Sequence, residues 1–307
     1  MNIQPPLKSA ARRSKAQSSV FDPPFAVVRP EPQSIPFVFS SPHSGRHYPP
    51  DFLAASRLDL MTLRRSEDSF IDSLYAGAPD LGAPLLHALF PRAFLDPNRE
   101  PYELDPAMFE DSLPAYANTR SLRVAGGLGT VARVVTDGAE IYRRKMVFAE
   151  AERRIEDLYL PYHRTLRGLL DETKRRFGYA VLIDCHSMPS VGGPMDQDSG
   201  HDRAHFVLGD RFGTSCSPGL TQLAEETLSA MGYTVARNNP YAGGYTTDHY
   251  GRPVNGIHAL QIEINRALYM DEERIEPHGQ FERVSRDLMD LIAKLASLKP
   301  GSFGARL

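Results

Sequence analysis

Short apolar runs alternate with amphipathic stretches along most of the chain. The apolar runs predict β-strands at residues 37–41, 179–185, 205–208, 234–237 and 257–265, with one or two more within 83–96. Apolar positions at helical spacing predict helices at residues 66–78, 139–177, 220–231 and 276–298. We divide the longest of these near residues 159–162, because Pro161 has no amide hydrogen with which to continue a helix. The alternation predicts an α/β fold with a mixed or mostly parallel sheet.

Two segments lack this alternation. Residues 1–24 are rich in proline, serine and basic residues, and we predict a mobile N-terminal tail there. Residues 97–120 are rich in Pro, Asn, Asp and Tyr, which predicts a long irregular segment, and such segments in compact domains are often functional. The sequence contains no internal repeat and no obvious linker after residue 30, so we expect residues 25–307 to form a single domain.

The composition narrows the class of protein. The chain has 307 residues, enough to bury a large core, and its formal net charge of −3 gives no reason to expect nucleic acid or a membrane as partner. No apolar run is long enough to span a bilayer, and the basic N-terminus lacks the apolar stretch of a secretory signal. Cys185 and Cys216 are the only cysteines, so we expect no disulfide framework and a cytoplasmic location. The oligomeric state stays open.

Histidines follow two of the predicted strands. His43 comes after the strand at 37–41, and His186 comes after the strand at 179–185. Ligands of open α/β sheets bind beyond the carboxyl ends of the strands, so we expect the two imidazoles to meet there. Hydrolytic zinc sites use histidine and carboxylate ligands and keep one position open for water. The sequence therefore predicts a metal-assisted hydrolase in which His43 and His186 bind zinc or another divalent transition metal.

Such a hydrolase also needs a third ligand and a general base. Glu67 and Asp68, at the start of the predicted helix 66–78, are the nearest acidic candidates for the third ligand. Either of them is equally compatible with a first-turn residue favoured by the helix dipole. Glu263 lies among apolar neighbours of the last strand, where burial raises a carboxyl pKa toward the working pH of a general base. The alternative for Glu263 is an ion pair with Arg266 or with an arginine of a neighbouring strand.

Several arginines fall in or near the irregular segment. Arg92 precedes it, and Asn98 and Arg99 place an amide and a guanidinium side by side. Arginine binds carboxylates through two parallel hydrogen bonds, so these residues indicate an anionic substrate. From the residues alone, an ion-pair network with the neighbouring Asp and Glu residues is the better explanation.

Five motifs together resemble those of a known family. They are Ser41-Pro-His43-Ser-Gly45, Asp96-Pro-Asn98-Arg99, Ile183-Asp-Cys-His186-Ser-Met188, Asn239-Pro-Tyr-Ala-Gly-Gly244 and Leu260-Gln-Ile-Glu263-Ile-Asn-Arg266. In this order they resemble the N-formylglutamate amidohydrolase family, over about residues 36–298. The resemblance implies a zinc carboxypeptidase-like fold, a three-layer α/β/α sandwich around a mixed, mostly parallel sheet. It also implies a small anionic N-acyl amino acid as substrate, N-formyl-L-glutamate, cleaved to formate and L-glutamate as in histidine degradation.

The resemblance further implies a set of metal ligands. His43 and His186 match the family's zinc ligands, and the acidic ligand falls on Asp68 in preference to Glu67. Arg46 stands where the carboxypeptidase zinc pattern has a glutamate, so the choice between Asp68 and Glu67 stays open.

The resemblance also implies roles for the residues that act on the substrate. Glu263 matches the general base, Arg92 the arginine that stabilises the oxyanion, and Asn98 with Arg99 the pair that holds the substrate carboxylate. Two other functions stay open at this point. One is a carboxypeptidase-like metallohydrolase of another N-acyl or peptide substrate, and the other is a binding protein that kept the fold but lost catalysis.

Overall fold

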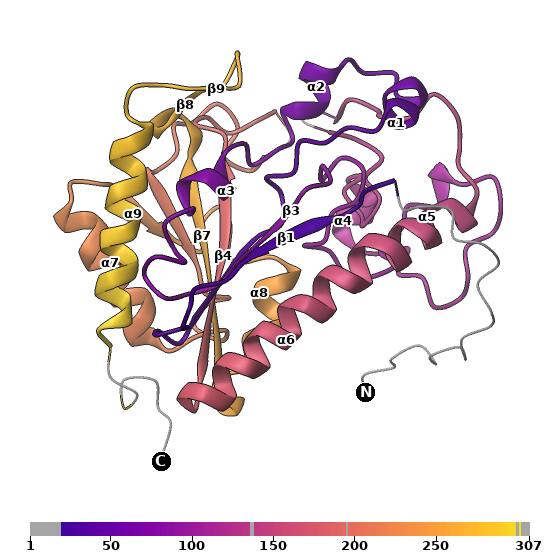
Figure 1. Cartoon of the computed structure of the whole chain (residues 1–307). Helices are drawn as coiled ribbons and strands as arrows, with labels where there is room; N and C mark the ends of the chain where they lie inside the picture. The colour runs from indigo at the N-terminus through magenta and orange to yellow at the C-terminus, as the bar shows by residue number, and fades with distance from the viewer. Residues whose placement is uncertain (1–19, 136–137, 195, 299–300, 302–307) are drawn as a thin grey trace.

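A seven-stranded sheet organises the protein. The computed structural model describes residues 20–135, 138–194, 196–298 and 301 (Figure 1). The strands lie in the order β1-β3-β2-β4-β7-β5-β6. Their bounds are β1 Phe25–Val28, β2 Phe37–Ser41, β3 Leu85–Ala88, β4 Ala180–Met188, β5 Phe206–Gly209, β6 Val235–Arg237 and β7 Ile257–Asn265. Only the β1–β3 and β5–β7 pairs within this sheet are antiparallel, so the predicted mixed, mostly parallel sheet is confirmed.

Helices cover both faces of the sheet and give the three layers (Figure 1). Helices α3 (Ile71–Leu74), α7 (Pro218–Ala230) and α9 (Phe281–Ala296) pack on one face, where their apolar residues join one buried cluster. Helices α6 (Leu160–Phe177) and α8 (Tyr245–Tyr250) pack on the other face with a second cluster. The shorter elements are α1 Pro50–Ala55, α2 Leu60–Arg64, α4 Leu122–Ala125, α5 Phe148–Arg154 and a hairpin of β8 Met270–Asp271 with β9 Glu276–Pro277.

Strand β4 shows how the sequence separates the two cores. Its side chains alternate between faces, so Val181 and Ile183 join the cluster under α7 and α9, while Leu182 joins the cluster under α6. By the same alternation Asp184 and His186 belong to the α6 face, at the carboxyl end of the strand. The strand is buried throughout, and its polar end therefore needs partners within the protein.

We expect the Leu182→Ala variant to lose about 2–5 kcal/mol of unfolding free energy, because the leucine is fully buried and its removal leaves a cavity. Urea denaturation measures this loss. The control is Leu122→Ala on α4, where the side chain is 93% exposed and the change is expected to stay within about 0.5 kcal/mol. Equal effects of the two substitutions would contradict the placement of Leu182 in the core.

Two helix predictions need correction. Of the predicted helix 66–78, only Ile71–Leu74 is α-helical, because Phe70 takes a left-handed conformation with φ 67° and starts the helix late. The predicted division near 159–162 is also wrong: α5 continues through a π-turn at Ile155–Tyr159 into α6. Pro161 lies in the first turn of α6 and has no amide hydrogen to donate. The π-turn before it is wider than an α-helical turn, so the helix continues here without a hydrogen bond from Pro161.

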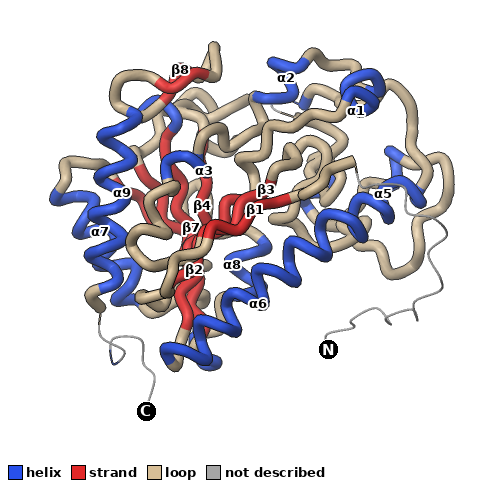
Figure 2. The backbone as a smooth tube through the Cα atoms, in the orientation of Figure 1, coloured by secondary structure: helices blue, strands red, loops and turns tan. Residues whose placement is uncertain are grey.

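Other segments differ less from expectation. The irregular segment 97–120 is confirmed, with only a short 3₁₀ turn at Pro106–Met108, and Figure 2 shows mostly loop between β3 and α5. Residues 1–19 of the predicted tail lie outside the described residues. Within its last residues Phe21 is buried against Phe90 and Phe94, so packed chain begins before residue 25, and β1 was not predicted. In the part of the chain that the structure describes, no helix combines the length and apolarity needed to cross a membrane.

Candidate active site

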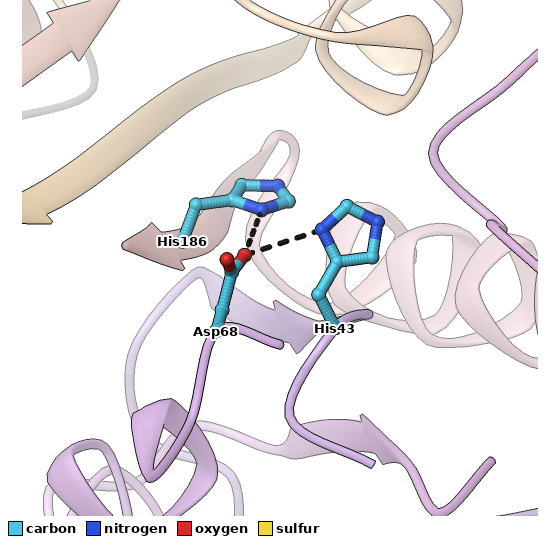
Figure 3. A group of neighbouring side chains, drawn as sticks. All are labelled: His43, Asp68 and His186. Carbon is cyan, nitrogen blue, oxygen red and sulfur yellow. Dashed lines mark hydrogen bonds and ion pairs between the residues drawn. The ribbon is translucent and has the colours of Figure 1, made fainter. Parts of the chain in front are cut away.

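The predicted histidines meet at one edge of the sheet. Strands β2, β4 and β7 are parallel neighbours, so their carboxyl ends lie at the same edge. His43 lies two residues beyond the end of β2, His186 lies near the end of β4, and Glu263 is the register partner of His186 on β7. Figure 3 shows the rings of His43 and His186 turned toward the carboxylate of Asp68, and their centroids are 4.8 Å apart. The spatial convergence expected from the strand ends is therefore confirmed.

Three donor atoms converge in this group. The Oδ2 atom of Asp68 lies 3.2 Å from Nδ1 of His43 and 2.9 Å from Nδ1 of His186. All three residues are buried, and their ligand atoms lie within 4.8 Å of one another. Two imidazoles and a carboxylate are a donor set suited to zinc and similar divalent metals. The group can hold a metal ion.

The outer ring nitrogens of both histidines face carboxylates. Nε2 of His43 lies 2.7 Å from Oδ1 of Asp96, and Nε2 of His186 lies 3.1 Å from Oδ1 of Asp184. Metal-binding histidines typically pair their second nitrogen in this way, which fixes the ring and its tautomer. The buried Asp184 is held in turn by Thr247 of α8. These partners leave both Nδ1 atoms directed toward Asp68, as a metal site requires.

The structure separates the two acidic candidates for the third ligand. Glu67 is buried but turned away from the histidines: its carboxylate accepts hydrogen bonds from Tyr48 at 2.8 Å, Ser69 at 2.8 Å and Arg64 at 3.2 Å. The backbone N–H of Asp68 donates to the carbonyl of His43 at 3.0 Å, which places its side chain between the imidazoles. The geometry favours Asp68.

Burial and charge act against each other at these groups. Burial raises the pKa of Asp68, but hydrogen bonds from His186 and His43 outweigh it and hold that pKa well below its usual range. Burial lowers the pKa of His186, but the carboxylates of Asp184 and Asp68 outweigh it and raise that pKa well above its usual value. The carboxylates that face the imidazoles therefore favour positive charge between them, which suits a bound cation.

Arg266 joins this centre from the end of β7. Its guanidinium lies 3.3 Å from Oδ1 of Asp68 and donates to the backbone carbonyls of Arg65 and Glu67 and to the hydroxyl of Ser187. The alternative pairing of Arg266 with Glu263 is therefore not what the structure shows. Arg266 holds the Asp68 segment against the strand ends, a role that the sequence did not reveal.

The carboxyl group of Glu263 has the environment expected for a general base. Its side chain is buried, and Oε1 accepts a hydrogen bond of 2.9 Å from the side-chain amide of Gln261. Burial is the largest influence on its pKa and raises it to about 7. A carboxyl group of this kind can both accept and return a proton near neutral pH.

Arg92 and Arg99 both contact Asp96. Nη2 of Arg92 donates to Oδ2 of Asp96 at 2.9 Å, and Nη1 lies 3.8 Å from Oδ1 of Asp68. Arg99 lies 3.4 Å from Asp96 and donates to the carbonyls of Leu128 and Asn98. The ion-pair network considered from the sequence thus exists, and it surrounds the carboxylate that orients His43.

The side chain of Asn98 lies inside the site. Its amide oxygen accepts from the backbone N–H of Thr246 at 2.8 Å, and its amide nitrogen lies 3.1 Å from Nε2 of His186. The sequence placed Asn98 in a motif but provided no sign that α8 lies against it. Asp96 stood out only as a motif neighbour of the predicted residues, and Asp184 only as one of the polar groups at the end of its strand, without a role in the site.

Comparisons with known proteins agree on one family. A family model described as N-formylglutamate amidohydrolase matches residues 35–270. The chain is 32% identical over 242 residues to an N-formylglutamate deformylase of Pseudomonas aeruginosa, covering 78% of this chain and 84% of that protein. It is 39% identical to the solved N-formylglutamate amidohydrolase of Ralstonia eutropha JMP134, with a TM-score of 0.82 over 89% of this chain and 97% of that one. The fold also matches gene product Atu2144 of Agrobacterium tumefaciens at 18% identity, with a TM-score of 0.62 over 89% and 93% of the two chains. The chain belongs to the N-formylglutamate amidohydrolase family.

Proposed function

We propose that this protein is a metal-dependent amidohydrolase that cleaves N-formyl-L-glutamate to formate and L-glutamate. The observation that carries the proposal is the buried donor set of His43, Asp68 and His186 at the strand ends, with Glu263 on the neighbouring strand. The names of the Pseudomonas and Ralstonia relatives support the choice of substrate. Zinc is the metal that we propose, because the donors are two imidazoles and one carboxylate.

Different residues of the chain carry out different parts of the proposed reaction. A divalent metal bound by His43, Asp68 and His186 would polarise the formyl carbonyl and acidify a water molecule. Glu263 accepts a proton from the attacking water and returns it to the nitrogen of the departing glutamate. Arg92, whose side chain is 23% exposed, has guanidinium N–H groups beyond its bond to Asp96, and these stabilise the negative charge that develops on the formyl oxygen.

We propose that Asn98 and Arg99 lie against a carboxylate of the substrate. Arg99 donates to two loop carbonyls and lies beside Asp96. A guanidinium has five N–H donors, so some of them stay free to bind a carboxylate of the substrate. Burial is the largest influence on Arg99 and lowers its pKa to about 10, so the guanidinium stays charged at neutral pH. Nη1 of Arg99 donates to the backbone carbonyl of Asn98 at 2.8 Å, and the side-chain amide of Asn98 contacts Thr246 and His186, so Asn98 links this arginine to the site.

The test is a comparison of kcat/KM for N-formyl-, N-acetyl- and N-succinyl-L-glutamate and for N-formyl derivatives of uncharged amino acids, with the metal content measured on the same protein. We expect kcat/KM for N-formyl-L-glutamate to exceed that for N-acetyl-L-glutamate by at least about 10-fold, because a pocket shaped around the formyl hydrogen would have to accommodate the methyl group of the acetyl substrate. A higher value for another substrate would support a different metallohydrolase. Inactive protein without affinity for added zinc would support a binding protein.

We expect the Asp96→Asn variant to bind metal about 10- to 100-fold more weakly, because Asp96 orients the imidazole of His43. Chelator competition followed by metal analysis measures the affinity. The matched control is Asp105→Asn, since Asp105 also pairs with an arginine, Arg133, and none of its hydrogen bonds or ion pairs with described residues involves a histidine. Unchanged metal affinity in Asp96→Asn would show that the His43–Asp96 contact does not support the site.

Two finer expectations also belong to the proposal: a cytoplasmic location and a role in histidine degradation. Cys185 and Cys216 are both free and buried thiols, which is compatible with the reducing conditions of the cytoplasm. A role in histidine degradation is expected only because the family resemblance implies it. Both expectations are separate from the chemistry of the site and are tested in the source organism.

A further inference from the structure

The general base has a single hydrogen-bond partner among the described residues. Oε1 of Glu263 accepts from Nε2 of Gln261 at 2.9 Å, and both side chains are buried. The two residues lie two positions apart on β7 and therefore share one face of the sheet. In the strand register Gln261 lies opposite Asp184 and Glu263 lies opposite His186, so the pair runs alongside the end of β4.

The orientation of the Gln261 amide is set by its other end. Its oxygen accepts a hydrogen bond of 2.8 Å from the backbone N–H of Gly244. Because the N–H of Gly244 can only donate, the oxygen of the amide must face it and the nitrogen must face Glu263. The carboxylate therefore meets a donor, which stabilises its ionised form and holds Oε1 in place.

Gly244 is itself tied to the metal-binding residues. A Cβ atom on Gly244 would lie 2.4 Å from Nδ2 of Asn98, so no side chain fits there without displacing the asparagine. Asn98 in turn contacts Nε2 of His186 and the backbone N–H of Thr246. A continuous set of contacts thus leads from Glu263 through Gln261, Gly244 and Asn98 to His186.

We propose that Gln261 is a positioning residue for the general base: fixed by the Gly244 backbone, it holds one oxygen of Glu263 and leaves the other for the attacking water. The proposal rests on the proposed function, because it needs Glu263 to be the base. It gives a role to the Asn239–Gly244 motif, which supplies the amide that fixes Gln261 and the glycine that admits Asn98.

The test begins with Gln261→Met, which keeps the length and apolar volume of the side chain but cannot donate a hydrogen bond. We expect kcat to fall about 10- to 100-fold, since small displacements of a catalytic group have effects of this size. KM and metal stoichiometry are expected to change less than about 3-fold, because neither depends on the orientation of Glu263. The control is Gln33→Met, which removes a part-buried amide bonded to Ile35, Phe37 and Thr173, and is expected to leave kcat unchanged.

A double substitution distinguishes positioning from general damage. If Gln261 acts through Glu263, adding Gln261→Met to Glu263→Gln produces no further loss of kcat. Losses that multiply, or a kcat within 2-fold of wild type in Gln261→Met, would overturn the proposal. Failure of wild type on every N-acyl substrate would instead refute the proposed function. In that case crystal structures still decide the positioning role: Glu263 is expected to change rotamer in Gln261→Met, and an unchanged rotamer overturns it.

Discussion

Glu263→Gln is expected to lower kcat by about 10²- to 10⁴-fold while the protein keeps its metal. The substitution preserves the size of the side chain and its contact with Gln261 but removes the group that accepts the proton of the attacking water. Glu263 is not among the residues whose ligand atoms converge with those of His43 and His186, so metal binding is not expected to depend on it. Steady-state kinetics on N-formyl-L-glutamate, with metal analysis of the same samples, measures both quantities.

The matched control is Glu276→Gln in β9, an exposed glutamate that lies outside the group of site residues. It is expected to keep wild-type kcat and metal content. If Glu263→Gln kept more than about a tenth of the wild-type kcat, Glu263 would not be the base, because acid–base catalysis by a positioned carboxylate contributes at least about 10²-fold. If it lost the metal as well, its role would be that of a ligand.

The edge of the sheet at which the site lies was predictable from local pattern. An apolar run followed by a polar residue marks the end of a strand, and strand β2 has the predicted bounds, 37–41. Parallel neighbouring strands bring their carboxyl ends together whatever their distance in sequence. His43, His186 and Glu263 could therefore be placed near one another before any coordinates were known.

The parts that could not be predicted depend on contacts between distant segments. The sequence presented Glu67 and Asp68 as equivalent neighbours in one helical turn. In the structure the left-handed Phe70 delays the start of that helix to Ile71, and Arg266, which lies far along the chain, holds the Asp68 segment. Helix α8 follows the Gly243–Gly244 pair, and its backbone N–H at Thr246 meets Asn98 across about half the chain. Local periodicity contains no information about such pairings, so Asp96, Asp184 and Gln261 went unassigned.

We expect substitutions at two adjacent buried carboxylates to affect metal binding differently: Asp68→Asn to lose the metal and Glu67→Gln to keep it. Asp68→Asn removes the charged donor between the two imidazoles, so we expect metal affinity to fall more than about 100-fold and turnover to disappear with it. Glu67→Gln leaves that donor intact but weakens the bonds from Tyr48 and Arg64, so we expect a loss of about 1–3 kcal/mol in unfolding free energy with the metal retained.

Chelator competition gives the metal affinities, and urea denaturation of the metal-free proteins gives the stabilities. Measuring both separates loss of a ligand from loss of the fold, since Asp68→Asn also leaves Arg266 without its charged partner and is expected to be destabilised. A folded Asp68→Asn protein that binds metal as tightly as wild type would exclude Asp68 as the third ligand. Metal loss in Glu67→Gln, at a concentration of denaturant where that protein is folded, would transfer the role to Glu67 and would require its carboxylate to leave Tyr48 and Ser69 when the metal binds.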